Sequence, residues 1–166
     1  MLEHFINAVI DLGYKFNTEY CNTYDMEKGI VGVDNPREVL INIFNNPQFW
    51  IDAPMIENSY EGLYYLNSTY DTWIATSPWN EENKKTKIEW VKKCYPFFDT
   101  SKILFSHHKW LLDGDVIIED KPDTIEKCND IGMMTICKSQ PYNLDTTPTA
   151  FLYSWKDIYD VMEDIL

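Results

Sequence analysis

Apolar residues in the first fifty positions recur at the spacing of amphipathic helices. One predicted helix carries Phe5, Ile6, Val9 and Ile10 on one side. A second runs from Pro36 to Asn46, where proline occupies a position that it favours at the start of a helix. We expect these two helices to form a small cap.

From about residue 56 the pattern changes to helices that alternate with short apolar strands. The expected strands are Thr72–Ala75, Ile103–Phe105, Val116–Ile118 and Met133–Cys137. The expected helices contain Ile56 to Tyr64, Asn83 to Tyr95, the segment that opens at Pro122, and Ser154 to Leu166. Strands separated by helices are typical of a parallel sheet with crossover connections. The sequence therefore predicts one α/β domain over residues 1–166, with a mainly helical cap in 1–50 and an α/β core in 51–166.

The charge balance of the chain is strongly acidic. Its 166 residues include 14 Lys and Arg against 27 Asp and Glu, a formal net charge of −13. This charge excludes a nucleic-acid binder that works through a basic surface. Apolar residues make up 45% of the chain and aromatic residues 15%, so the composition is that of a folded protein and excludes a disordered one.

Cysteine spacing and the length of the apolar runs restrict the cellular setting. The four cysteines are Cys21, Cys94, Cys128 and Cys137. Their spacing is too irregular for a zinc site. No apolar run reaches membrane-spanning length, and the first residues lack the basic and apolar pattern of an export signal. We expect a cytoplasmic protein with free thiols and no membrane partner.

Polar side chains at the carboxyl ends of two predicted strands are the candidates for chemistry. Thr76 and Ser77 follow one strand and suit a phosphate oxygen, although both are also ordinary turn residues. Glu119 and Asp120 follow another, where adjacent carboxylates suit Mg²⁺; the alternative is a solvated turn before a helix. Lys87 lies toward the buried side of its helix, where it either covers apolar surface or presents its charge to a phosphate.

Together these parts resemble the 5′(3′)-deoxyribonucleotidases of the haloacid dehalogenase superfamily. The matching stretches are Pro47–Trp50, Ile74–Pro78, Thr86–Val91, Asp115–Asp123 and Ser154–Trp155. The resemblance implies a haloacid dehalogenase-like, Rossmann-like parallel sheet with a small helical cap. It also implies a Mg²⁺-dependent phosphatase that hydrolyses deoxyribonucleoside monophosphates through an aspartyl phosphate, and it allows a homodimer.

The resemblance also implies a role for each polar candidate. Thr76 and Lys87 would be catalytic, because the Thr76 hydroxyl holds the phosphoryl group and Lys87 neutralises it. Ser77 would contribute to substrate binding and Asp120 would bind Mg²⁺. Glu119 stands where the family commonly has Asp, and its longer side chain puts its share in metal binding in doubt.

Aromatic residues of the predicted cap resemble those that stack on the base in this family. Phe44, Phe49 and Trp50 are substrate-binding candidates on this ground, and Trp79 is a candidate for the rim of the pocket. The alternative for the three cap residues is core packing, since large aromatic side chains usually fill the interior.

The front of the chain departs from the family pattern. Such enzymes begin with an apolar strand that ends in Asp-x-Asp, whose first Asp attacks phosphorus and whose second protonates the leaving oxygen. Here the segment Met1–Phe5 resembles the one that follows this motif. We therefore expect the chain to start roughly 10 to 15 residues late, the length of one strand and its turn, so that the first strand is missing.

Three hypotheses follow from these observations. The first is a deoxyribonucleotidase-like phosphatase represented by a chain without its first motif. The second is a catalytically inactive nucleotide-binding or regulatory protein that retains Thr76, Lys87 and Asp120. The third, ranked last, is an acidic decoy for a basic partner, because the acidic residues form no continuous stripe in the sequence.

Overall fold

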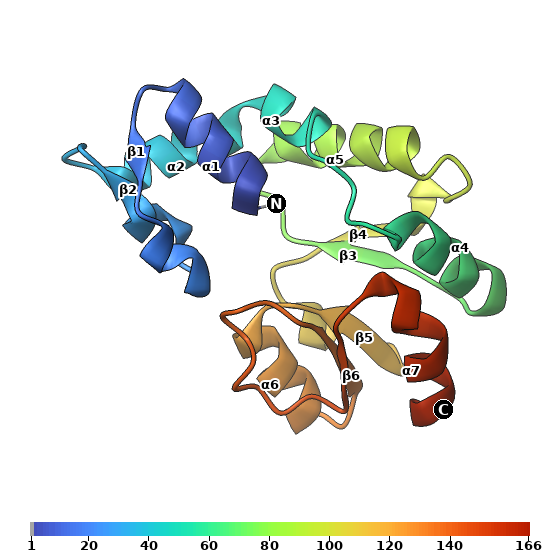
Figure 1. Ribbon diagram of the computed structural model, residues 1–166. Helices are drawn as coiled ribbons and strands as arrows, with labels where there is room; N and C mark the ends of the chain where they lie inside the picture. The colour runs from blue at the N-terminus through green and yellow to red at the C-terminus, as the bar shows by residue number, and fades with distance from the viewer. Residues whose placement is uncertain (1) are drawn as a thin grey trace.

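The N-terminal part of the chain is built from short helices. The computed structural model describes residues 2–166 (Figure 1). The helices here are α1 (Leu2–Asp11), α2 (Pro36–Asn45) and α3 (Pro47–Ile51). Between α1 and α2 lie the 3-10 helices η1 (Thr18–Asn22) and η2 (Met26–Gly29) and the antiparallel strands β1 (Lys15–Phe16) and β2 (Ile30–Val31). We call residues 2–51 the helical region.

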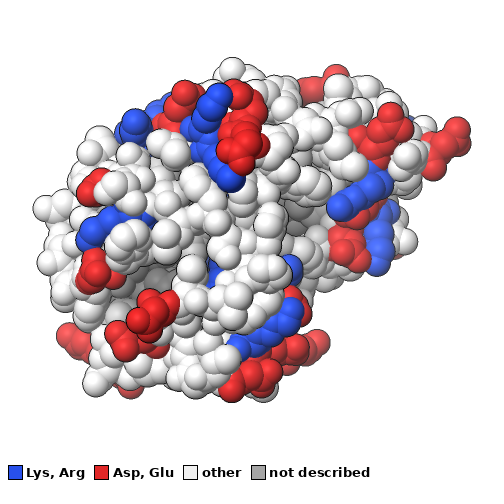
Figure 2. All heavy atoms as spheres, turned by 180° about the vertical axis from the view of Figure 1, so that it is seen from behind, with Lys and Arg blue, Asp and Glu red and all other residues white. Residues whose placement is uncertain are grey.

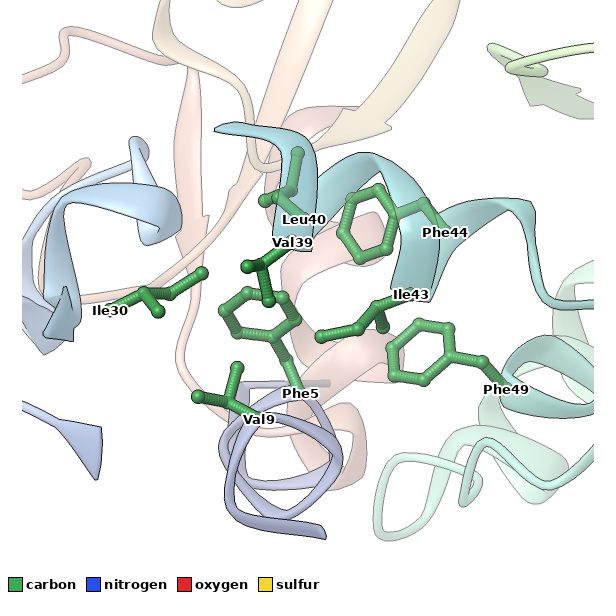
Figure 3. Packing of buried hydrophobic residues seen from close by; sticks show 8 residues of the cluster. All are labelled: Phe5, Val9, Ile30, Val39, Leu40, Ile43, Phe44 and Phe49. Atoms are coloured by element: carbon green, nitrogen blue, oxygen red, sulfur yellow. The ribbon is translucent and has the colours of Figure 1, made fainter. Parts of the chain in front are cut away.

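An apolar cluster holds the helical region together. Phe5 and Val9 of α1 are fully buried against α2, and the Phe5 and Phe44 rings meet at 5.8 Å in an edge-on arrangement (Figure 3). The start of α2 is fixed locally, because the Asn35 side chain accepts the Glu38 backbone N–H. Both predicted helices of this part are therefore present, whereas α3 and the short strands were not predicted. A strand of two residues is too short to show the alternation of apolar and polar residues by which strands are predicted.

The rest of the chain alternates helices and parallel strands. These elements are α4 (Ser59–Thr69), β3 (Ile74–Thr76), α5 (Glu81–Cys94), β4 (Ile103–Phe105), β5 (Val116–Glu119), α6 (Pro122–Asp130), β6 (Met134–Lys138), β7 (Ala150–Leu152) and α7 (Ile158–Ile165). Strand β3 pairs with β4, and β5 pairs with β6, which pairs with β7; all three pairings are parallel. The predicted α/β class is confirmed, as is its Rossmann-like arrangement of parallel strands and helices.

Several boundaries differ from the predicted ones. Strand β3 begins two residues later than expected, because its register pairs Ile74 with Ile103 and so matches the three residues of β4. The predicted closing helix begins instead with a 3-10 turn, η5 (Trp155–Asp157), since the Ser154 side chain accepts the Lys156 backbone N–H. Strand β7 was not predicted.

The parallel strands form two separate sheets, β3–β4 and β5–β6–β7. Within residues 2–166, β3 and β5 therefore each have one edge without a strand partner. Burial differs in the same way between these strands. Strand β6 is paired on both sides, and its residues Thr135, Ile136 and Cys137 are 0% exposed. By contrast, β3 and the apolar residues of β5 are only half-buried.

Charged side chains are distributed in mixed groups on the face shown in Figure 2, where acidic and basic residues lie side by side. Lysine and arginine side chains therefore provide positive charge locally, although the formal net charge of the chain is −13. Across residues 2–166, we find no helix with the length and apolar character needed to cross a membrane.

Candidate active site

The first part of the site is a contact between the end of β3 and helix α5. The Lys87 ammonium donates to the Thr76 hydroxyl at 2.8 Å and to the Ser77 carbonyl at 2.9 Å. The Asn80 side chain accepts the Asn83 N–H and so fixes the start of α5, the helix that carries Lys87. Helical periodicity therefore turns Lys87 inward, as the sequence indicated, and the structure brings Thr76 and Lys87 together.

Burial changes the acid–base behaviour of Lys87. Desolvation, aided by the positive charge of Lys109, lowers the pKa of Lys87 from its ordinary value near 10.5 to about 8. The ammonium also lies 5.1 Å from the centre of the Trp50 ring. Lys87 is thus a desolvated cation at a strand end, which is a suitable position for binding an anion.

Ser77 is held by the neighbouring strand connection. Its hydroxyl donates to the Ser106 carbonyl at 3.0 Å, and the Ser106 N–H donates to the Thr76 carbonyl at 3.0 Å. These bonds fasten the end of β3 to the end of β4. In this arrangement Ser77 stabilises the loop, and its contact with a substrate stays a prediction.

Lys109 is a site residue that the sequence interpretation missed. It opens the 3-10 helix η4 (Lys109–Leu111), and its ammonium forms an ion pair with the Glu119 carboxylate at 2.5 Å. The Lys109 side chain is 18% exposed and that of Glu119 is 5% exposed. Its position shortly after the end of β4 was the available signal, because β3 and β4 are parallel and end at the same edge.

Glu119 serves as the partner of Lys109. Its second carboxylate oxygen accepts the backbone N–H groups of Asp120 at 3.0 Å and Lys121 at 3.2 Å. Burial by itself would raise the pKa of Glu119, but the Lys109 charge and these hydrogen bonds outweigh it and lower the pKa. Both carboxylate oxygens of Glu119 are therefore engaged, and its share in metal binding stays a prediction.

Asp120 is the second carboxylate of this pair. One of its oxygens accepts the Tyr142 hydroxyl at 2.6 Å, and its carboxylate also interacts with that of Glu119. Burial, together with the neighbouring Glu119 charge, raises the pKa of Asp120. The described part of the chain contains no group of three His, Cys, Asp or Glu side chains able to hold a metal ion. Asp120 thus fits as one oxygen ligand for Mg²⁺, and further ligands are needed to complete a site.

Comparison with known proteins decides the family. Residues 11–165 match the family described as "5' nucleotidase, deoxy (Pyrimidine), cytosolic type C protein". The chain belongs to this family. It is 25% identical over 150 residues to the 5'(3')-deoxyribonucleotidase of Bacillus subtilis strain 168, with 84% of each chain covered, and the same values hold for that of Bacillus phage SPbeta. A protein of the same name from Clostridium acetobutylicum is 25% identical over 87 residues, covering 52% of this chain and 48% of the relative.

The aromatic candidates of this deoxyribonucleotidase-family chain fall into two groups. Phe44 and Phe49 are 7% and 6% exposed and pack in the core of the helical region, in agreement with the alternative of core packing. Trp50 donates its indole N–H to the Phe44 carbonyl at 2.8 Å, and its ring lies near the Lys87 ammonium. Trp79 is 43% exposed and meets Phe44 edge-on at 5.4 Å. Trp50 and Trp79 are therefore the two of these four candidates with more than a small accessible surface, and their contact with a substrate stays a prediction.

Proposed function

We propose that this chain is a phosphatase of deoxyribonucleoside monophosphates, in which Thr76, Lys87 and Lys109 bind the phosphoryl group. The observation that carries the proposal is the 2.8 Å contact between the Lys87 ammonium and the Thr76 hydroxyl at the end of β3. A hydroxyl and a desolvated ammonium at one strand end offer donors to the oxygens of a phosphate. The family of the chain and the names of its relatives support the same substrate class.

Local charge offsets the overall charge of the chain. A net charge of −13 repels a nucleotide at long range, whereas Lys87 and Lys109 present two ammonium groups close to each other in a partly buried site. Interactions in such a site are less screened than on the surface. Binding of the phosphoryl group therefore depends mainly on these two lysines, and salt weakens it less than it weakens contacts on the surface.

We expect the affinity for inorganic phosphate to fall as the pH rises through about 8. The pKa of Lys87 is about 8 in the folded chain, so above this pH the side chain loses the charge that attracts the anion. Isothermal titration calorimetry between pH 7 and 9 measures the change. The Lys87→Met variant provides the control, because it should lose the step near pH 8; a step of equal size in that variant would contradict the assignment.

The nucleophile in this proposal is an Asp on a strand that lies between β3 and β5. The unpaired edges of these two strands and their partial exposure support such a position. The Asp oxygen forms a bond to phosphorus as the bond to the nucleoside oxygen breaks, and a second acid protonates that oxygen. Water then hydrolyses the aspartyl phosphate and releases inorganic phosphate. Mg²⁺, held by Asp120 and the carboxylates of this strand, would supply positive charge for the phosphoryl oxygens.

Two chains test the proposal: residues 1–166 alone, and a chain extended by the residues that the upstream reading frame encodes. We expect dUMP and dTMP to release phosphate in the presence of Mg²⁺ with the extended chain only. Replacement of the first Asp of the added strand by Asn should remove this activity. An extension without an apolar strand and Asp-x-Asp, or an extended chain that releases no phosphate, would refute the phosphatase assignment.

The second candidate function is nucleotide binding without turnover. It is favoured by the contacts of Thr76, Lys87 and Lys109, which can bind a phosphoryl group whether or not a nucleophile is present. It predicts that dUMP binds to residues 1–166 and is not hydrolysed by the extended chain either. Calorimetry and phosphate release on the same two chains therefore separate the two functions.

A further inference from the structure

The loop that follows β6 holds Asp120 through two consecutive residues. The Tyr142 hydroxyl donates to the Asp120 carboxylate at 2.6 Å, and the Asn143 side-chain amide donates to the Asp120 backbone carbonyl at 2.8 Å. One bond orients the carboxylate and the other fixes the backbone from which it projects. A hydrogen bond to a charged acceptor is stronger than one between neutral groups, so the Tyr142 bond restricts the carboxylate effectively.

The Asn143 side chain is buried and held by several hydrogen bonds. It is 1% exposed, and its amide also donates to the Lys138 carbonyl at 3.0 Å, while its oxygen accepts the Gln140 N–H at 2.7 Å. Every polar group of this buried side chain is therefore used. The loop that carries Tyr142 is thus attached at its base to the ends of β5 and β6.

The outer side of Tyr142 touches the helical region. The Tyr24 ring, which lies between η1 and η2, meets the Tyr142 ring edge-on with 5.6 Å between their centres. The Lys121 ammonium lies 5.9 Å from the centre of the Tyr24 ring. Tyr24 is 52% exposed, so this contact is made at the surface and involves few other groups.

We propose that Tyr142 is a positioning residue for Asp120 and that Tyr24 connects it to the helical region. Through these two contacts the position of Tyr24 affects that of Tyr142, and the position of Tyr142 affects the orientation of the Asp120 carboxylate. The proposal rests on the proposed function in that it takes Asp120 as a ligand of Mg²⁺ at the phosphoryl site. The contact between Tyr24 and Tyr142 is independent of any ligand.

Coupling between two sites is reciprocal, and this property supplies the test. Hydrogen exchange by mass spectrometry on the full chain should show faster exchange in residues 139–145 when Tyr24 is replaced by Ala. It should also show faster exchange in residues 20–26 when Asp120 is replaced by Ala or Tyr142 by Phe. We expect increases of about threefold to tenfold, since the contacts involved contribute on the order of 1 kcal/mol.

Two control variants match these changes. Tyr24→Phe keeps the ring that touches Tyr142 and should exchange as the unmodified chain does. Glu126→Ala removes an exposed acid of the following helix, α6, and should leave residues 20–26 unchanged. Unchanged exchange in residues 139–145 of Tyr24→Ala and in residues 20–26 of Asp120→Ala would overturn the proposal. Thermal unfolding of every variant identifies any that fail to fold, and Tyr24→Ala, at an exposed position, remains informative in that case.

A second measurement distinguishes positioning from a purely structural contact. Tyr142→Phe should raise the Mg²⁺ concentration needed for half-maximal enhancement of phosphate binding about tenfold, because it removes one charge-assisted hydrogen bond from the proposed ligand. Phosphate binding without Mg²⁺ should not change. An unaltered Mg²⁺ requirement would refute the positioning role of Tyr142. If the unmodified chain shows no effect of Mg²⁺ on phosphate binding, the metal part of the proposed function fails, and the exchange experiment still decides the coupling.

Discussion

Replacement of Lys87 by Met is expected to weaken the binding of inorganic phosphate about 100-fold, because it removes a charge-assisted hydrogen bond from a desolvated site. The Lys87 ammonium is the group that reaches the Thr76 hydroxyl and the Ser77 carbonyl. Met preserves most of the volume of the buried side chain and needs no partner. Calorimetry with phosphate or dUMP measures the loss.

The matched control for this change is Lys85→Met on the same helix. The Lys85 side chain is 72% exposed and pairs with Glu82, so its removal should change phosphate affinity less than twofold. The desolvation that lowers the pKa of Lys87 also implies that Lys87→Met folds at least as stably as the unmodified chain. Equal phosphate affinity of the two variants would exclude Lys87 from the site.

Replacement of Glu119 by Leu is expected to destabilise the fold by about 3–5 kcal/mol, because it leaves the buried Lys109 ammonium without a partner. It also removes the acceptor for the N–H groups of Asp120 and Lys121 at the start of α6. Urea unfolding followed by circular dichroism measures the change in the free energy of unfolding.

Two comparisons separate the ion pair from other effects of this substitution. Glu126→Leu changes an exposed acid on α6 and should alter stability by less than about 0.5 kcal/mol. The double change Lys109→Met and Glu119→Leu removes both charges and should regain part of the loss. A double variant that is less stable than Glu119→Leu would show that the pair does not cause the effect.

Some features of the candidate site depend only on residues close together in the chain and could be predicted from the sequence. The inward direction of Lys87 follows from helical periodicity within α5, and the hydroxyls that follow β3 stand next to each other in the chain, so both features could be predicted. Asparagine side chains before α2 and α5 accept backbone N–H groups of the first turn, which makes the helix starts local as well. The order of helices and strands was predictable for the same reason.

The remaining features depend on residues far apart in the chain. The pairing of Lys109 with Glu119 spans ten residues, and the bond from Tyr142 to Asp120 spans 22, so no periodicity relates them. The partners of Glu119 and Asp120 could not be predicted for this reason: the sequence shows two adjacent acids, whereas the tertiary structure gives each acid a different partner.

The sequence by itself determined the α/β class, the main helices, among them the one that carries Lys87, and the strand ends at Thr76 and Asp120, because each depends on neighbouring residues. Only the tertiary structure decided which cations and acids pair, that Phe44 and Phe49 pack in the core of the helical region, and that the strands form two sheets. These outcomes depend on burial and on contacts between distant segments, where desolvation requires each buried charge to have a partner.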